Sequence, residues 1–231
     1  MRLRTMTVLG LSALTLLALA GCSAGSAPAP GPASSSPAAA RQTGSNAPTQ
    51  EPLPSAVLRQ RLLGESDLGG GYIRKPEQPA RHNDVTVTGC PALAKLGGDG
   101  AAGGSLAFPH RAKMSFTYAG GTGSEVSEEL YSDTATKLSD GVDRIFEAMT
   151  ACSTYDVLAG GTPIVVAPQR VPAPQLGDER WSHLLTFTVS GRTSIVKQTA
   201  VRIGAVVVVI SGTPALVDAH VERAVAKATG R

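Results

Sequence analysis

The spacing of apolar residues predicts two long helices in the second half of the chain. After Ser132, a predicted N-cap, apolar side chains recur every three or four positions and trace one helical face from Ala135 to Cys152. A second periodic stretch, 214–228, follows Thr213, which is a predicted N-cap, and begins with a proline. Shorter helices are expected at 54–63 and 91–96.

Alternating or continuous apolar runs predict strands before and after the first long helix. The strands expected before it lie near residue 72, at 85–88, and in a hairpin of 111–118 with 124–131. The strands expected after it form a three-strand meander over 181–189, 193–203 and 205–211. The run AVVVVI at 205–210 lacks polar alternation, which is typical of a central strand covered on both faces. The proline-interrupted stretch 163–174 is assigned no strand.

This order of elements has no βαβ alternation and no internal repeat. It predicts an α+β fold, in which an antiparallel sheet with a C-terminal three-strand meander carries two main helices. The helix face that ends at Cys152 should point into the core, because its apolar positions share one side of the helix.

The first 22 residues predict an export signal with a lipid attachment site. Arg2 and Arg4 precede an uncharged apolar stretch that is too short for a comfortable membrane span. It ends in Leu19-Ala20-Gly21-Cys22, which resembles the lipobox of bacterial lipoproteins; the alternative is an ordinary signal peptide with an incidental cysteine. We expect removal of the signal peptide, residues 1–21, and attachment of acyl chains such as palmitate to Cys22. Two chains would hold the protein stably on the extracytoplasmic face of the cell membrane.

Residues 23–50 predict a spacer between this anchor and the folded part. They contain five prolines, one charged residue and no aromatic or large aliphatic residue. Such a composition buries too little apolar surface to offset its chain entropy, so we expect it to be disordered and to span roughly 30 Å. The predicted organisation is a lipidated cysteine with its linker over 22–51 and one α+β domain over 52–231.

The two other cysteines follow from this placement. If Cys22 is lipidated, Cys90 and Cys152 remain as a pair in an oxidising compartment, 62 positions apart. We expect them to form a disulfide, which the loop-entropy argument values at about 4 kcal/mol. The alternative is a pair of buried free thiols.

The charge balance argues against a nucleic-acid partner. The formal net charge of +3 includes the two arginines of the signal peptide, so the chain without it carries +1. A nearly neutral chain lacks the basic surface with which proteins bind phosphate backbones.

Several short motifs together resemble the PknH-like extracellular sensor domain of actinobacterial lipoproteins and kinases. They are LLGESDLGGGY near residue 62, LGDERWSH near 176 and VRIGAVVVVIS near 201, together with the two cysteines, and the resemblance spans about residues 55–228. It implies an antiparallel sheet with packed helices and a ligand-receiving cleft, stapled here by Cys90 and Cys152 alone. It supplies no catalytic residues and no kinase signature.

Motifs for catalysis or cofactors lack their structural context. Gly98–Gly103 matches G-x-G-x-x-G, but a Cys-Pro turn precedes it and more glycine follows, so a loop is favoured over a nucleotide site. Ser194 and Lys197 match S-x-x-K within a strand pattern, without its companion motifs. The four histidines are scattered, so we expect no metal and no cofactor.

The densest group of versatile polar residues is Asp178–His183. We take Arg180, Trp181 and His183 as candidate ligand-binding residues, with the alternative that Trp181 fills the core. The function expected is a non-catalytic sensor domain that binds a small envelope molecule or peptide. The alternatives are an interaction module for an envelope protein and, less favoured, an envelope hydrolase.

Overall fold

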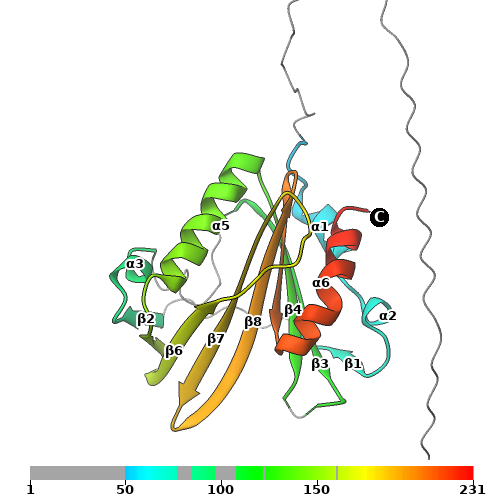
Figure 1. Ribbon diagram of the computed structural model, residues 1–231. Coiled ribbons are helices and arrows are strands. Elements are labelled where there is room, and N and C mark those ends of the chain that lie inside the picture. Colours follow the sequence, from blue (N-terminus) through cyan, green and yellow to red (C-terminus); the bar gives the residue numbers. More distant parts are fainter. Residues whose placement is uncertain (1–49, 77–84, 97–107, 122, 160, 231) are drawn as a thin grey trace, which may run out of the picture. The chain divides into compact units, whose positions relative to one another are not determined.

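The computed structural model describes residues 50–76, 85–96, 108–121, 123–159 and 161–230 (Figure 1). Within them, nine strands form one sheet in the order β1-β3-β4-β9-β8-β7-β6-β5-β2, and every neighbouring pair is antiparallel. The strands are β1 (Tyr72–Arg74), β2 (Val85–Thr88), β3 (His110–Tyr118), β4 (Glu125–Ser132), β5 (Tyr155–Ala159), β6 (Thr162–Arg170), β7 (Glu179–Val189), β8 (Arg192–Ile203) and β9 (Val206–Gly212). The helices are α1 (Ser55–Arg61), α2 (Glu65–Leu68), α3 (Pro91–Ala94), α5 (Ala135–Thr150) and α6 (Pro214–Ala228). This arrangement confirms the α+β class.

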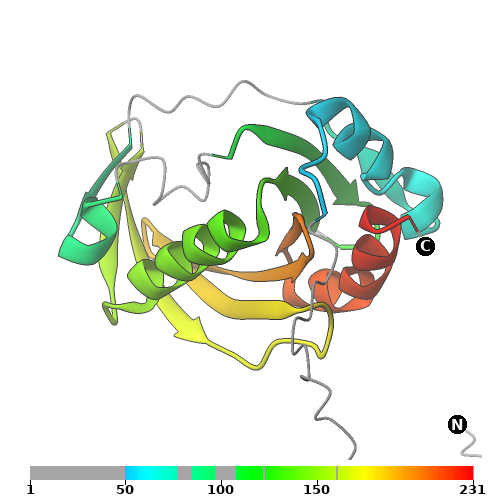
Figure 2. The same cartoon turned by 90° about the horizontal axis from the view of Figure 1, so that it is seen from above.

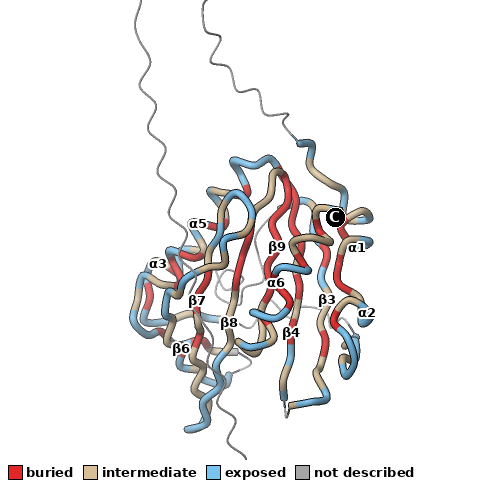
Figure 3. The backbone as a smooth tube through the Cα atoms, turned by 45° about the vertical axis from the view of Figure 1, so that its right-hand side comes forward, coloured by how far each residue is buried: buried red, intermediate tan, exposed pale blue. Residues whose placement is uncertain are grey.

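The valine-rich strand β9 lies in the middle of the sheet and is buried on both faces. It pairs with β4 on one side and with β8 on the other. Val206, Val208 and Ile210 pack into a core cluster with residues of α1 and α6. Val207 and Val209 point the other way and pack with residues of α5. Figure 3 shows the buried backbone along β9, which confirms the predicted central strand.

The helices therefore cover opposite faces of the sheet (Figure 2). Helix α6 lies over β9, β8 and β4, with α1 beside it. Helix α5 crosses the other face, where Leu138, Val142 and Phe146 contact the sheet. The C-terminal end of α5, with Ala148 and Met149, packs in a third cluster beside α3 and strands β5, β6 and β7.

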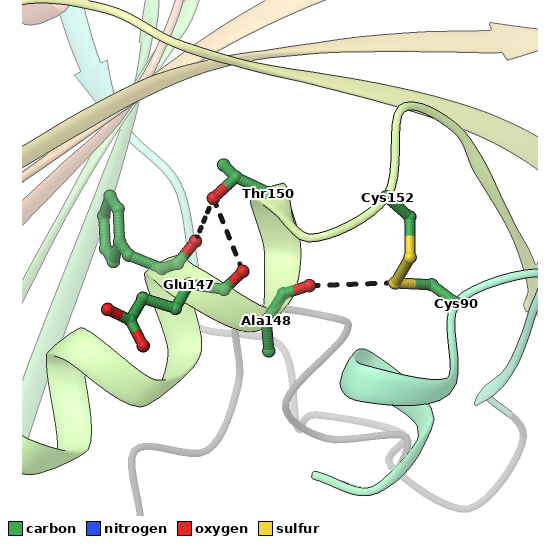
Figure 4. The surroundings of a disulfide bond; sticks show 6 residues. Cys90, Glu147, Ala148, Thr150 and Cys152 are labelled. Carbon is green, nitrogen blue, oxygen red and sulfur yellow. Dashed lines mark hydrogen bonds between the residues drawn. A yellow bond between two sulfur atoms is a disulfide. The ribbon is translucent and has the colours of Figure 1, made fainter.

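Cys90 and Cys152 form a disulfide, with their Cα atoms 5.8 Å apart. The bridge joins the residue before α3 to the segment that follows α5 (Figure 4). The Cys90 Sγ lies 3.8 Å from the carbonyl oxygen of Ala148, so the bridge packs against the last turns of α5. The disulfide prediction is confirmed, and the alternative of two free thiols is wrong.

Two local predictions are wrong. Ser132 is not the N-cap of α5, since it ends β4 and its hydroxyl donates to the carbonyl oxygen of Ala205 at 2.5 Å. The N-cap is Thr134. The stretch 163–174, to which no strand was assigned, contains most of β6, which lies between β5 and β7.

Several predicted features lie outside the described residues. These are Cys22, most of the linker and the Gly98–Gly103 motif, together with one of the four histidines, His82. In the part of the chain that the structure describes, no helix combines the length and the apolar character needed to cross a membrane.

Candidate functional site

The face of the sheet that α5 covers contains a hollow, called here the α5 hollow. It is bounded by β4, β8, β9 and α5, and its lining residues are Glu129, Tyr131, Val142, Ile145, Phe146, Gln198 and Val209. The hollow measures about 340 Å³ including the part open to solvent, and the space that a water molecule can enter is small. That space accommodates one water or a methyl-sized group without movement of the walls.

Strand alternation and register bring these residues together. Glu129 and Tyr131 are two positions apart on β4 and therefore point to the same face. Glu129 lies opposite Val209 of β9, and Gln198 of β8 points to this face as well. On α5, the lining residues are three or four positions apart, so they share one side of the helix. The walls are mostly apolar, with polar groups on two sides.

The first polar wall is the carboxylate of Glu129. Lys113, directly opposite on β3, donates to Oε1 at 2.5 Å. The hydroxyl of Tyr131 donates to Oε2. Burial raises the pKa of Tyr131, which is 2% exposed, so the phenol stays protonated and remains a donor. The carboxylate is thus held in place and its charge is matched.

The second polar wall is the amide of Gln198. Its Oε1 lies 2.9 Å from Nε2 of His183, on the neighbouring strand β7. The imidazole is fully buried and stacks on the ring of Phe146, with centroids 4.5 Å apart. Burial lowers the pKa of His183 to about 4, and the positive charge of Arg170 acts in the same direction. His183 is therefore neutral near pH 7.

The structure separates the three candidate ligand-binding residues. Trp181 and His183 point to the α5 face, whereas Arg180 lies between them in sequence, points to the other face and is exposed. The indole N–H of Trp181 donates to Asp143 of α5, and its ring packs near Phe146, so Trp181 anchors the helix to the sheet. Only His183 contacts lining residues of the α5 hollow through both a hydrogen bond and ring stacking.

The acidic residues before Trp181 have a structural role. Arg202 donates to Glu179 at 2.9 Å and to Asp178 at 3.1 Å. Asp178 also accepts from the backbone N–H of Gly204, at 2.8 Å, in the turn between β8 and β9. The hydrogen bond from Arg202 lowers the pKa of Glu179. These groups fasten the start of β7 to the next turn of the meander.

In the described part of the chain, the other candidate motifs do not form a catalytic or metal-binding group. His220 is paired with the hydroxyl of Tyr72 at 2.6 Å, and neither His183 nor His220 is hydrogen-bonded to a carboxylate there. Ser194 and Lys197 lie on strand β8, as the strand pattern predicted, and their spacing of three sends them to opposite faces. Among the described residues, no three His, Cys, Asp or Glu side chains are grouped as metal ligands.

No local sequence pattern identifies Glu129, Tyr131 and Gln198 as residues of one site, because their association depends on which strands become neighbours. Strand alternation places Glu129 and Tyr131 on one face, but nothing local indicates that β4 pairs with β9, about 80 residues later. Gln198 is brought to the same face through β8, which pairs with the other edge of β9.

No protein-family model and no curated protein sequence matches this chain. The fold is similar to the crystal structure of the extracellular domain of PknH from Mycobacterium tuberculosis. The TM-score is 0.56 and the identity 13%, over 78% of this chain and 99% of that chain. A putative uncharacterized protein from Mycobacterium smegmatis (Rv0999 ortholog) gives a TM-score of 0.37 at 14% identity, over 70% and 92%. The similarity to the PknH domain shows a PknH-like fold and nothing beyond the fold.

Proposed function

We propose that this protein is a lipid-anchored lipoprotein on the extracytoplasmic face of the cell membrane, with a non-catalytic sensor domain. The domain binds a small envelope molecule or peptide at the α5 hollow, with a methyl-sized group of the ligand in the enclosed part and the rest in the part open to solvent. The observation that carries the proposal is a partly enclosed apolar hollow with polar groups converging from two walls, on a fold shared with an extracellular domain.

The disulfide and the chain start support the location. Cys90 and Cys152 are joined, which fits an oxidising compartment, and Leu19-Ala20-Gly21-Cys22 fits a lipid attachment site. A single acyl chain gives only marginal binding to a membrane, so the anchor is stable because two or more acyl chains are expected on Cys22.

The surface gives less support to a docking role. In the described residues, the exposed large apolar side chains are Ile73, Val165 and Ile195. Ile73 is on the edge strand β1, while Val165 and Ile195 are on β6 and β8 with β7 between them. Three separate side chains do not make the contiguous apolar patch that marks a stable protein interface.

Native mass spectrometry of the full-length protein, extracted from its own membrane, tests this proposal. The expected spectrum shows the diacylated chain and, in addition, a non-covalent adduct that is lost on collisional activation. The matched control is Val209→Trp, which places a large side chain at the hollow and should abolish the adduct while the acyl mass stays. A protein free of any adduct in repeated preparations would refute the binding function, and an unacylated chain would refute the anchor.

A further inference from the structure

The orientation of the Gln198 amide is set by a neighbour that is itself fully buried. The His183 ring is 0% exposed, is stacked on Phe146 and has its Nε2 2.9 Å from Oε1 of Gln198. A ring that is neutral carries a single N–H, on one of its two nitrogens. Which nitrogen carries it decides what Gln198 presents to the α5 hollow.

The contacts place that proton on Nε2. The Oε1 of Gln198 can only accept, so the nitrogen facing it must donate. The other ring nitrogen, Nδ1, is buried and has no hydrogen-bond partner among the described residues. A bare acceptor in that position is less costly than an N–H without an acceptor, because buried orphan N–H groups are the rarer case in proteins.

With Oε1 engaged by His183, the NH2 group of Gln198 remains for the hollow. No described residue accepts a hydrogen bond from it. On the opposite wall, Lys113 donates to one oxygen of Glu129 and balances its charge, and the hydroxyl of Tyr131 donates to the other oxygen. The hollow therefore offers amide donors beside apolar side chains, and no uncompensated charge.

We propose, resting on the binding function proposed above, that His183 is a positioning residue that turns the amide hydrogens of Gln198 toward the α5 hollow. The hollow then recognises an uncharged carbonyl oxygen with a small apolar substituent, as in an amide or a peptide group. An anion finds no unpaired cation there, and a cation must compete with Lys113 for Glu129. Selectivity for neutral ligands follows from these pairings.

The first test measures the tautomer of His183 in the full chain by nitrogen-15 NMR. The expected spectrum shows a protonated Nε2 and an unprotonated Nδ1 without titration between pH 5.5 and 8. A protonated Nδ1, or an imidazolium forming in this range, would overturn the positioning role whether or not a ligand binds. This readout does not depend on any ligand and so stays separate from the proposed function.

The second test titrates the protein with N-methylacetamide and follows the side-chain amide signal of Gln198. Acetate and methylammonium, which are smaller than N-methylacetamide and charged, are the controls. A saturable shift with N-methylacetamide alone is expected, and Gln198→Leu should abolish the binding. Equal or stronger shifts with either ion, or none with N-methylacetamide up to the highest concentration at which the protein stays folded, would overturn the ligand class.

Two variants of His183 separate positioning from a packing role. His183→Phe keeps the stacked ring but removes the donor, so N-methylacetamide affinity should fall about fivefold, the effect of one hydrogen bond. His183→Gln restores an N–H near the position of Nε2 and should recover most of the affinity. Equal losses in both variants would contradict the inference, and the tautomer measurement decides it if either variant fails to fold.

Discussion

Glu128, next to Glu129 on β4, is a carboxyl group buried beneath the N-terminal segment. It is 1% exposed and faces the side of the sheet that α1 and α6 cover. Its Oε2 accepts from the backbone N–H of Leu63 at 2.6 Å, while Oε1 has no partner among the described residues. The neighbouring cation, Lys227, is paired with Asp67 instead. Burial therefore raises the pKa of Glu128 from 4.5 to about 7.

The substitution Glu128→Gln should make the protein more stable at alkaline pH. The folded protein holds the Glu128 proton more tightly than the unfolded chain, so this group lowers the stability as the pH rises from 4.5 to about 7. The full loss is about 3 kcal/mol. Glutamine is the uncharged isostere and its oxygen can still accept from Leu63. We expect no difference near pH 4 and a gain of about 2 to 3 kcal/mol at pH 8.

The titration of His183 gives the wild-type protein and the Glu128→Gln variant differently shaped profiles of unfolding free energy against pH. Its folded pKa is lowered to about 4, so its contribution to stability is complete above pH 6.5 and is lost as the pH falls toward 4. In the wild-type protein this gain with rising pH opposes the loss at Glu128 over nearly the same range. In the variant only the gain remains, so the free energy of unfolding should rise steeply between pH 4 and 6.5.

Urea unfolding of the full chain at pH 4, 6 and 8, followed by fluorescence of Trp181, the single tryptophan, measures these free energies. Glu129→Gln is the matched control, since it makes the same change one position along but breaks the ion pair with Lys113. That control should lose up to about 1 kcal/mol at pH 8. A Glu128→Gln variant no more stable than wild type at pH 8, or equally stabilised at pH 4, would refute the reasoning.

Further predictions concern the disulfide, the anchor, and the two candidate residues Trp181 and Arg180 of β7. Replacing both Cys90 and Cys152 by alanine should lower the free energy of unfolding by about 2 to 4 kcal/mol in urea, and an unchanged midpoint would contradict the disulfide. Cys22→Ala should remove the acyl mass and move the protein out of the membrane fraction; retention with the acyl mass would disprove the assigned attachment site. Trp181→Phe should destabilise by about 1 kcal/mol without changing N-methylacetamide affinity, as judged by the NMR titration and by urea unfolding followed by circular dichroism, since this variant lacks the tryptophan. Arg180→Ala should alter neither quantity, and weaker probe binding in that variant would show that the other face of β7 takes part.

The sequence predicted the elements that local patterns determine. The meander β7-β8-β9 joins neighbours in the chain, and α5 and α6 each carry one apolar face, so alternation and helical spacing were sufficient. The disulfide followed from counting cysteines in the predicted compartment. These features depend on contacts within a short stretch or on a single pair of residues.

Strand β6 escaped prediction because of Pro163 and Pro168. A proline lacks an N–H and is rarely found within a central strand. In this sheet β6 pairs with β5 over residues 162–166 and with β7 over 165–170. Each proline therefore lies where only one neighbouring strand is paired, so its missing N–H need not break a ladder on both sides. The sequence alone does not reveal this offset between the two ladders.

Of the candidate ligand-binding residues, His183 is the one that contacts the α5 hollow's lining residues through both a hydrogen bond and ring stacking, and the binding role itself stays a prediction. Arg180, Trp181 and His183 are close in sequence, which favoured them as a group, yet strand alternation sends Arg180 to the opposite face. Glu129 and Gln198 meet at the hollow through the pairing of β4 with β9 and of β9 with β8. Such long-range register is set by the whole sheet and not by a local pattern.

The most direct test of the binding function is a crystal structure of the protein purified with its ligand from its own membrane. We expect electron density in the α5 hollow, between Phe146 and the Gln198 amide, with an oxygen atom within hydrogen-bond reach of that amide nitrogen. Density for the co-purified molecule at any other place on the domain, with the hollow empty, would contradict it.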